Sequence, residues 1–169
     1  MIKKLNISLF LSINQYTGLD QLLNNITLIV ARYIPLLFFI CLIYLWIKKG
    51  DKYKDIVLYS VYASILGLTI NFVMEFLFSN SVETFSDPVT FMLSVALMMT
   101  YFRETRKIGM ILLVLGLTGA FMSIYIMYIP LYILGSTGVA IISTISIYSI
   151  KEKLVSLNQI FKLIYLILK

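Results

Sequence analysis

Side chains able to do chemistry are scarce in this sequence of 169 residues. It contains no His and a single Cys, Cys41. Metal sites built from His or paired Cys, disulfide bonds, and acid–base or nucleophilic catalysis by His are therefore excluded, and we expect no cofactor. The remaining candidates are ionisable, aromatic or sulfur-containing side chains inside or beside long apolar stretches. They are Arg32, Glu75, Glu83, Asp87, Met122, Tyr125, Tyr128 and Tyr132.

The composition places these candidates in a membrane protein. Hydrophobic residues make up 60% of the chain and charged residues 13%, which is about half the charged fraction of a soluble domain. The mean hydropathy is +0.95, and a soluble core of this size could not bury so much apolar surface. The formal charge of +6 is typical of the basic cytoplasmic loops of membrane proteins, so we expect membrane lipid as a partner and no nucleic acid.

Charge-free intervals predict an all-α, polytopic membrane bundle that forms one domain over residues 1–169. A spanning helix needs about 20 mostly apolar residues. The third interval is short, but Pro88 suits the first turn of a helix, and Arg103 can extend its side chain to the membrane surface. The five predicted spans are about 26–47, 56–74, 88–102, 108–127 and 131–150.

The distribution of basic residues predicts the orientation of the bundle. Lysines and arginines follow the first, third and fifth predicted spans, whereas the segment from Glu75 to Asp87 contains three acids and no base. Because cytoplasmic loops carry the excess of Lys and Arg, we expect the N-terminus outside and the C-terminus inside.

Two further segments are expected to lie on the membrane surface. Residues 5–13 form a short apolar stretch, and residues 154–168 carry apolar side chains at helical spacing next to Lys153. Both patterns predict interfacial helices, the second of them on the inner leaflet. A sixth span is the alternative for the second segment, but a stretch of this length that includes Asn158 and Lys162 is poorly suited to crossing.

Small and polar residues within the predicted spans are expected to serve packing. Asn71 is expected to make an interhelical hydrogen bond, and Cys41 to be a buried apolar side chain. Arg32 either extends to the outer membrane surface or contacts a lipid phosphate, and the three tyrosines form either an aromatic belt or a pocket lining. Small residues four positions apart let helices approach closely. These pairs are Ala63 and Gly67, Gly116 and Ala120, and Ser136 and Ala140.

Four short stretches resemble one family of membrane enzymes. They are GLTINF (67–72), FSDP (85–88), FRETRKIG (102–109), and the frame TG, ten residues, P, four residues, GS (118–136). In this order they resemble the bacterial undecaprenyl-pyrophosphate phosphatases of the bacitracin-resistance type, within the type 2 phosphatidic acid phosphatase superfamily. The resemblance covers nearly the whole chain. It implies that family's helical scaffold, an outward-facing vestibule, and location in the bacterial cytoplasmic membrane.

The resemblance does not extend to the family's catalytic residues. That family dephosphorylates lipids with a His nucleophile, a second His as proton donor, and Lys and Arg that hold the phosphate. Its three motifs fall on residues 75–83, 86–88 and 121–132 of this sequence. There, Glu75 stands at the position of the Lys, and Tyr128 stands at that of the nucleophilic His. The sequence thus predicts the scaffold without the reaction.

Three functions remain open on this basis. The leading hypothesis is an inactive relative of the lipid phosphatases that acts as a lipid-binding, partner-binding or regulatory subunit. Its setting would be cell-envelope lipid metabolism, or immunity to antibiotics or bacteriocins. The alternatives are a small subunit of a transporter, partnered by another membrane protein or an ATPase subunit, and an active phosphatase with a non-standard mechanism. In each case the candidate residues are expected to line the vestibule.

Overall fold

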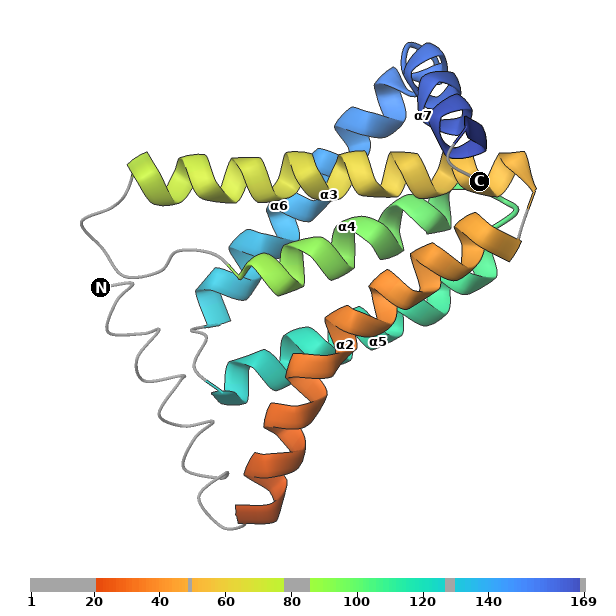
Figure 1. The fold of residues 1–169 in the computed structure, drawn as a ribbon. Coiled ribbons are helices and arrows are strands. Elements are labelled where there is room, and N and C mark those ends of the chain that lie inside the picture. Colours follow the sequence, from red (N-terminus) through yellow and green to blue (C-terminus); the bar gives the residue numbers. More distant parts are fainter. Residues whose placement is uncertain (1–20, 49, 78–85, 127–129, 168–169) are drawn as a thin grey trace.

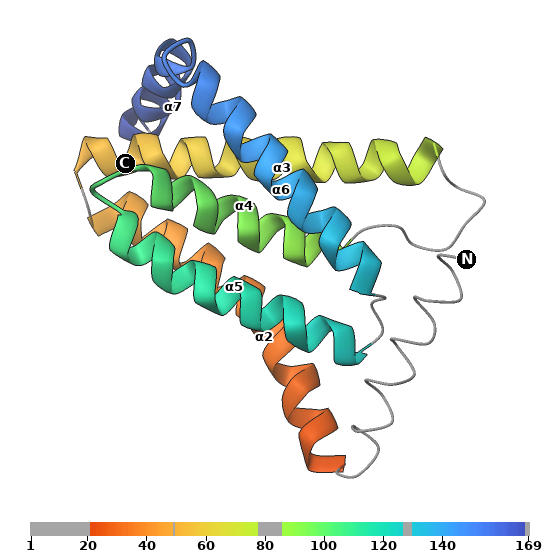
Figure 2. The same ribbon diagram turned by 180° about the vertical axis from the view of Figure 1, so that it is seen from behind.

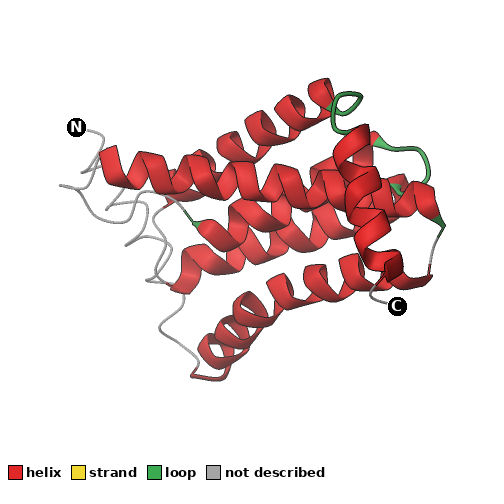
Figure 3. Ribbon diagram, turned by 45° about the horizontal axis from the view of Figure 1, so that its top comes forward, coloured by secondary structure: helices red, strands yellow, loops and turns green. Residues whose placement is uncertain are grey.

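Six helices form the described part of the chain (Figure 1). The computed structural model describes residues 21–48, 50–77, 86–126 and 130–167, without the side chains of 21–28, 30–32, 48, 123–126 and 130–131. Every regular element in these ranges is an α-helix (Figure 3), which confirms the all-α prediction. The helices are α2 (Gln21–Lys48), α3 (Asp51–Leu77), α4 (Asp87–Tyr101), α5 (Arg106–Ile126), α6 (Pro130–Ile150) and α7 (Val155–Ile167).

The predicted segments coincide with these helices. Each of the five predicted spans overlaps one helix from α2 to α6, and the predicted C-terminal interfacial segment overlaps α7. Helix α3 begins at Asp51 rather than at residue 56. Charged residues are compatible with a helix outside an apolar layer, so the helix extends beyond the charge-free interval. The predicted N-terminal interfacial helix lies outside the described residues.

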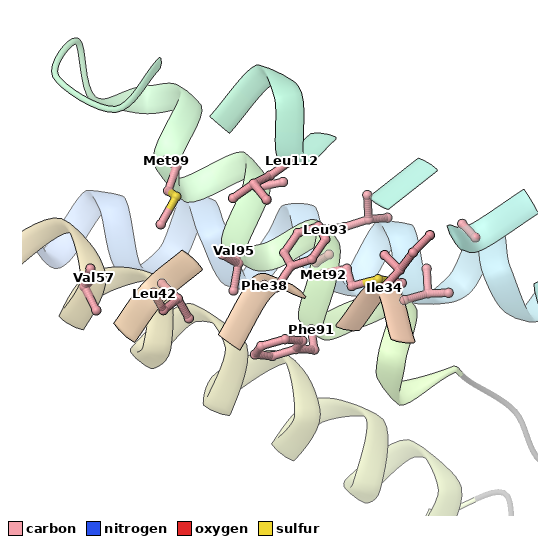
Figure 4. Packing of buried hydrophobic residues seen from close by; sticks show 14 of the residues in the cluster. Ile34, Phe38, Leu42, Val57, Phe91, Met92, Leu93, Val95, Met99 and Leu112 are labelled. Atoms are coloured by element: carbon pink, nitrogen blue, oxygen red, sulfur yellow. The ribbon is translucent and has the colours of Figure 1, made fainter. Parts of the chain in front are cut away.

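Helix α4 is the centre of the bundle. It packs on α3, α5 and α6, and makes a smaller contact with α2. Figure 4 shows its apolar side chains interleaved with those of α2 and α5, including Phe38 and Leu112. Pro88 occupies its first turn as expected, since proline there gives up no helical hydrogen bond. Because neighbouring helices surround α4, nearly all of its side chains from Val89 to Met99 are buried, which explains why its sequence is apolar all round.

Successive helices run in alternating directions along the bundle (Figures 1 and 2). The end of α2, the turn between α4 and α5, and the end of α6 therefore meet beside α7. We call this end, formed by the described residues of 48–55 (all but 49) together with 101–107 and 150–165, the α7 end. Tyr59 Oη of α3 donates a 3.2 Å hydrogen bond to the carbonyl oxygen of Lys151, just after α6. The Nζ of Lys151 lies 5.6 Å from the ring centroid of Phe102, just after α4. The three basic segments that the sequence assigns to one side thus lie together.

Glycines permit two close contacts with α4. A Cβ on Gly109 of α5 would lie 2.6 Å from the backbone nitrogen of Thr100, and a Cβ on Gly67 of α3 would lie 2.8 Å from Thr90 Cγ2. The turn before α5 is fixed by Thr105, whose Oγ1 donates a 2.8 Å hydrogen bond to the carbonyl oxygen of Met99. The packing role predicted for the small-residue pairs is confirmed, because all their members are buried: Ala63, Gly67, Gly116, Ala120, Ser136 and Ala140.

Two helices in the described ranges are long and apolar enough to cross a membrane, namely Asp51–Leu77 and Tyr132–Ile150. Tyr33–Ile47 and Val155–Ile167 are apolar but shorter, and α4 has 15 residues against the about 20 that a span needs. Length and composition thus do not support five spans. The prediction relied on charge-free intervals, and a buried central helix such as α4 satisfies that criterion without needing to face lipid.

We predict that Gly109→Ala lowers the free energy of unfolding by about 1–3 kcal/mol, because the methyl group must push α5 away from the backbone of α4. The measurement is thermal unfolding of the purified protein in a mild detergent. Gly138→Ala in α6 is the control, since a Cβ there meets nothing within 4 Å. It should leave stability unchanged or raise it by up to about 1 kcal/mol. Equal stability of the two variants would contradict the close contact between α4 and α5.

Candidate functional site

The residues predicted to line a vestibule are only partly described. Glu83 and Tyr128 lie outside the described residues, and so do the side chains of Arg32 and Tyr125. Of the others, Glu75 lies near the end of α3, Asp87 at the start of α4, Met122 near the end of α5, and Tyr132 near the start of α6.

These four side chains are not joined to one another. Within the described ranges, no hydrogen bond or ion pair connects Glu75, Asp87, Met122 and Tyr132. Asp87 instead accepts a 2.9 Å hydrogen bond from Nδ2 of Asn71, and its place in the first turn of α4 suits the positive end of the helix dipole. Asp87 therefore helps to join α4 to α3.

Asn71 links α3 to α4 at this end of the bundle. Its Nδ2 donates 2.9 Å hydrogen bonds to Asp87 Oδ1 and to Thr90 Oγ1, both on α4. Nearby, Ser136 Oγ of α6 accepts a 2.7 Å hydrogen bond from the backbone nitrogen of Ser86. The predicted interhelical role of Asn71 is thereby confirmed. The role of Thr90 in these contacts was not predicted. Polar residues at helical spacing on an otherwise apolar helix do, however, indicate one shared face.

Helix α7 docks on α3 through its polar side. Asp55 Oδ1 accepts a 3.0 Å hydrogen bond from Nδ2 of Asn158, and Asp55 Oδ2 lies 2.7 Å from Nζ of Lys162. The Tyr165 ring meets Trp46 of α2 edge-on at 5.6 Å between centroids. The opposite side of α7 exposes apolar side chains, among them Leu157, Ile160, Leu163, Ile164 and Ile167. The sequence predicted the amphipathic helix but not its attachment, which the four-residue spacing of Asn158 and Lys162 makes possible.

An apolar groove opens between α2 and α3, with α4 as its floor. Its volume is about 340 Å³, and its lining residues are Phe39, Leu42, Ile43, Trp46, Val57, Val61, Ser64, Ile65, Leu68 and Phe91. Phe39 and Phe91 stack at 4.4 Å between ring centroids. The single hydroxyl of the lining, that of Ser64, donates a 2.8 Å hydrogen bond to the carbonyl oxygen of Ser60. The lining therefore offers no acid, base or free nucleophile, and its chemistry suits hydrocarbon.

A second, smaller pocket of about 190 Å³ lies at the α7 end. Its lining mixes both charges with aromatic side chains: Lys52, Asp55, Ile56, Tyr59, Phe102 and Glu104. The pocket lies between the start of α3 and the turn that joins α4 to α5, and one of its lining residues, Asp55, is already bound by α7.

Cys41 of α2 is half-buried and packs against the apolar core, in line with its predicted packing role.

Comparison with known proteins gives no match. No protein-family model, no curated protein and no solved structure matches it. The resemblance to lipid phosphatases therefore stays a hypothesis from the motifs of the sequence.

We predict that Asp55→Asn loosens α7, because the amide offers one acceptor where the carboxylate accepts from both Asn158 and Lys162. The expected loss in the free energy of unfolding is about 1.5–3 kcal/mol, the range for hydrogen bonds to charged groups. Thermal unfolding and the rate of trypsin cleavage at Lys162 measure it.

Asp51→Asn is the matched control on the same helix. Asp51 also pairs with a lysine, Lys54, at 3.0 Å, but its side chain is 78% exposed whereas that of Asp55 is 33% exposed. The hydrogen bond from Lys54 lowers the pKa of Asp51, yet an exposed pair of this kind contributes little to stability. A cleavage rate unchanged by Asp55→Asn would show that the apolar contacts alone hold α7.

Proposed function

We propose that this protein is a non-enzymatic membrane protein that binds a lipid through the apolar groove between α2 and α3. The groove is the observation that carries the proposal, since it combines an apolar lining with an opening on the side of the bundle. The proposal retains the leading hypothesis from the sequence, an inactive relative of lipid phosphatases in the envelope of a bacterium, and selects lipid binding among its three roles.

Two features support a membrane environment. Large apolar side chains are exposed along the bundle, including Phe72 and Phe76 at 70% and 75%, and soluble monomers rarely expose apolar patches beyond a few hundred Å². Helix α7 turns its polar side towards Asp55 and its apolar side outward. In water, the apolar side of α7 would pack on the bundle and its polar side would face the solvent. Against lipid, the observed orientation is favourable.

The proposal includes five spans, with the basic segments in the cytoplasm. The supporting observation is that α2, α4 and α6 pack on α3, one of the two helices with the length and composition of a span, and that α5 packs on α4 and α2. If α3 crosses a bilayer, its neighbours must cross with it, and α4 can do so within a shell of protein. The three basic segments then lie on one side, as the positive-inside bias requires.

The absence of His from the sequence supports a role without catalysis. A lipid phosphatase of the resembled family needs a nucleophile, a proton donor and a cationic cradle together, and losing one such element usually costs several orders of magnitude in rate. The groove adds no substitute, because Ser64 carries the only nucleophilic group of its lining and that hydroxyl is engaged with Ser60.

We predict that the protein purified in a mild detergent retains lipid, and that Ile65→Trp reduces this retention several-fold because the indole fills the groove. Native mass spectrometry of the intact protein counts the retained lipids. Ile142→Trp in α6 is the control, since Ile142 is 59% exposed, like Ile65 at 57%, but lies outside the groove lining. Equal retention by the two variants would rule out the groove as the lipid site.

We also predict no phosphate release from undecaprenyl pyrophosphate above a detergent blank. Tyr128→His should not restore it, because a nucleophile without a proton donor or cationic cradle lacks most of the transition-state stabilisation. Sustained turnover by the unmodified protein, freed of contaminating phosphatases, would replace the binding role with an enzymatic one.

A further inference from the structure

The inner end of the groove carries features that identify its occupant more closely. Trp46, a groove-lining residue, contacts Tyr165 of α7. Lys54 Nζ lies 5.5 Å from the centroid of the same Tyr165 ring. On α3, Lys54 precedes the lining residues Val57 and Val61 by three and seven positions, so the three share one face of the helix. An indole, a phenol and an ammonium group therefore surround the point where the groove reaches the α7 end.

This combination fits the boundary between hydrocarbon and lipid headgroups. Trp and Tyr are enriched at that level of a bilayer, and Lys extends its ammonium group towards the headgroups. The charge of the segments at the α7 end is positive, because in the sequence residues 48–55, 101–107 and 150–165 together contain ten Lys or Arg and four Asp or Glu. Such a setting attracts an anionic headgroup.

Lys54 retains the capacity to bind such a headgroup. Its ammonium group has three N–H donors, and one of them is used in the hydrogen bond to Asp51. Asp51 is largely exposed, so a phosphate with its alkyl chain anchored in the groove competes well for Lys54.

The lining of the groove favours a hydrocarbon chain over a peptide. The groove has a volume of about 340 Å³, and its walls are almost entirely aliphatic and aromatic. The one hydroxyl among them, that of Ser64, is already bonded to Ser60, so the polar backbone groups of a peptide would find few partners there. An acyl chain brings no such groups.

We infer that the groove holds one acyl chain of an anionic phospholipid, whose phosphate lies beside Lys54 at the α7 end. This inference rests on the proposed function, since it names the class of lipid that the groove binds. It assigns to the inner side of the bundle a lipid site that is separate from the predicted outer vestibule.

The test is a competition between phosphatidylglycerol and phosphatidylcholine with identical acyl chains, measured by native mass spectrometry after reconstitution in nanodiscs. We expect the unmodified protein to prefer phosphatidylglycerol, and Lys54→Gln to reduce that preference about fivefold, the value for one lysine near a lipid surface. Asp51→Asn should increase the preference, because it removes the carboxylate that competes for Lys54. If Lys54→Gln does not fold, Asp51→Asn tests the inference instead, and an unchanged preference for phosphatidylglycerol in that variant would contradict it.

Lys153→Gln is the control, because it removes the same charge from an exposed residue at the α7 end that lies outside the groove. An equal loss of preference in this control would show that general surface charge attracts the lipid, and would overturn the inference. Equal binding of the two lipids by the unmodified protein would overturn the inference but leave lipid binding intact. Retention of no lipid at all, or of a peptide in its place, would overturn the proposed function as well.

Discussion

The close packing of α4 against its neighbours is the constraint on which the rest of the bundle depends. Helices approach this closely only where a side chain is missing, and Gly67 and Gly109 supply that gap on α3 and α5. In lipid, apolar side chains gain little from being transferred between helices, so van der Waals fit and interhelical hydrogen bonds hold a bundle together. The contacts of Asn71 with Asp87 and Thr90 supply the hydrogen bonds at one end of α4.

The groove follows from the same arrangement. Helix α2 packs mainly on α5 and makes fewer contacts with α3, so a gap remains between α2 and α3 above the surface of α4. The side chains of this gap resemble those of the core in type, but they face outward. A groove with such a lining can contact a ligand through shape and hydrocarbon, which is the basis for the lipid-binding role that we propose.

The sequence predicts the helices well but does not reveal the groove, for a physical reason. Charge-free intervals locate helices because charged residues are excluded from apolar layers, and Asn71 stands out because a lone amide in such a layer needs a partner. The groove residues do not stand out, since Val61 or Ile65 could equally face core or lipid. Which apolar residues line a gap is decided by how helices from distant parts of the sequence pack.

The same limit explains the predictions about spans and α7. The short interval that became α4 has the composition of a span, and only its contacts reveal that other helices cover it. The pattern of α7 indicated an apolar side for the membrane. It did not indicate that Asp55, far earlier in the chain, would bind the polar side.

The separation of Asp55 and Lys162, 107 residues apart in the chain, has a consequence for biogenesis. Because translation runs from the N-terminus, helices α2 to α6 are made before α7. Asp55 therefore gains its hydrogen-bond partners Asn158 and Lys162 only after the other described helices have been synthesised. A chain that ended before α7 would leave the carboxylate of Asp55 without these two donors.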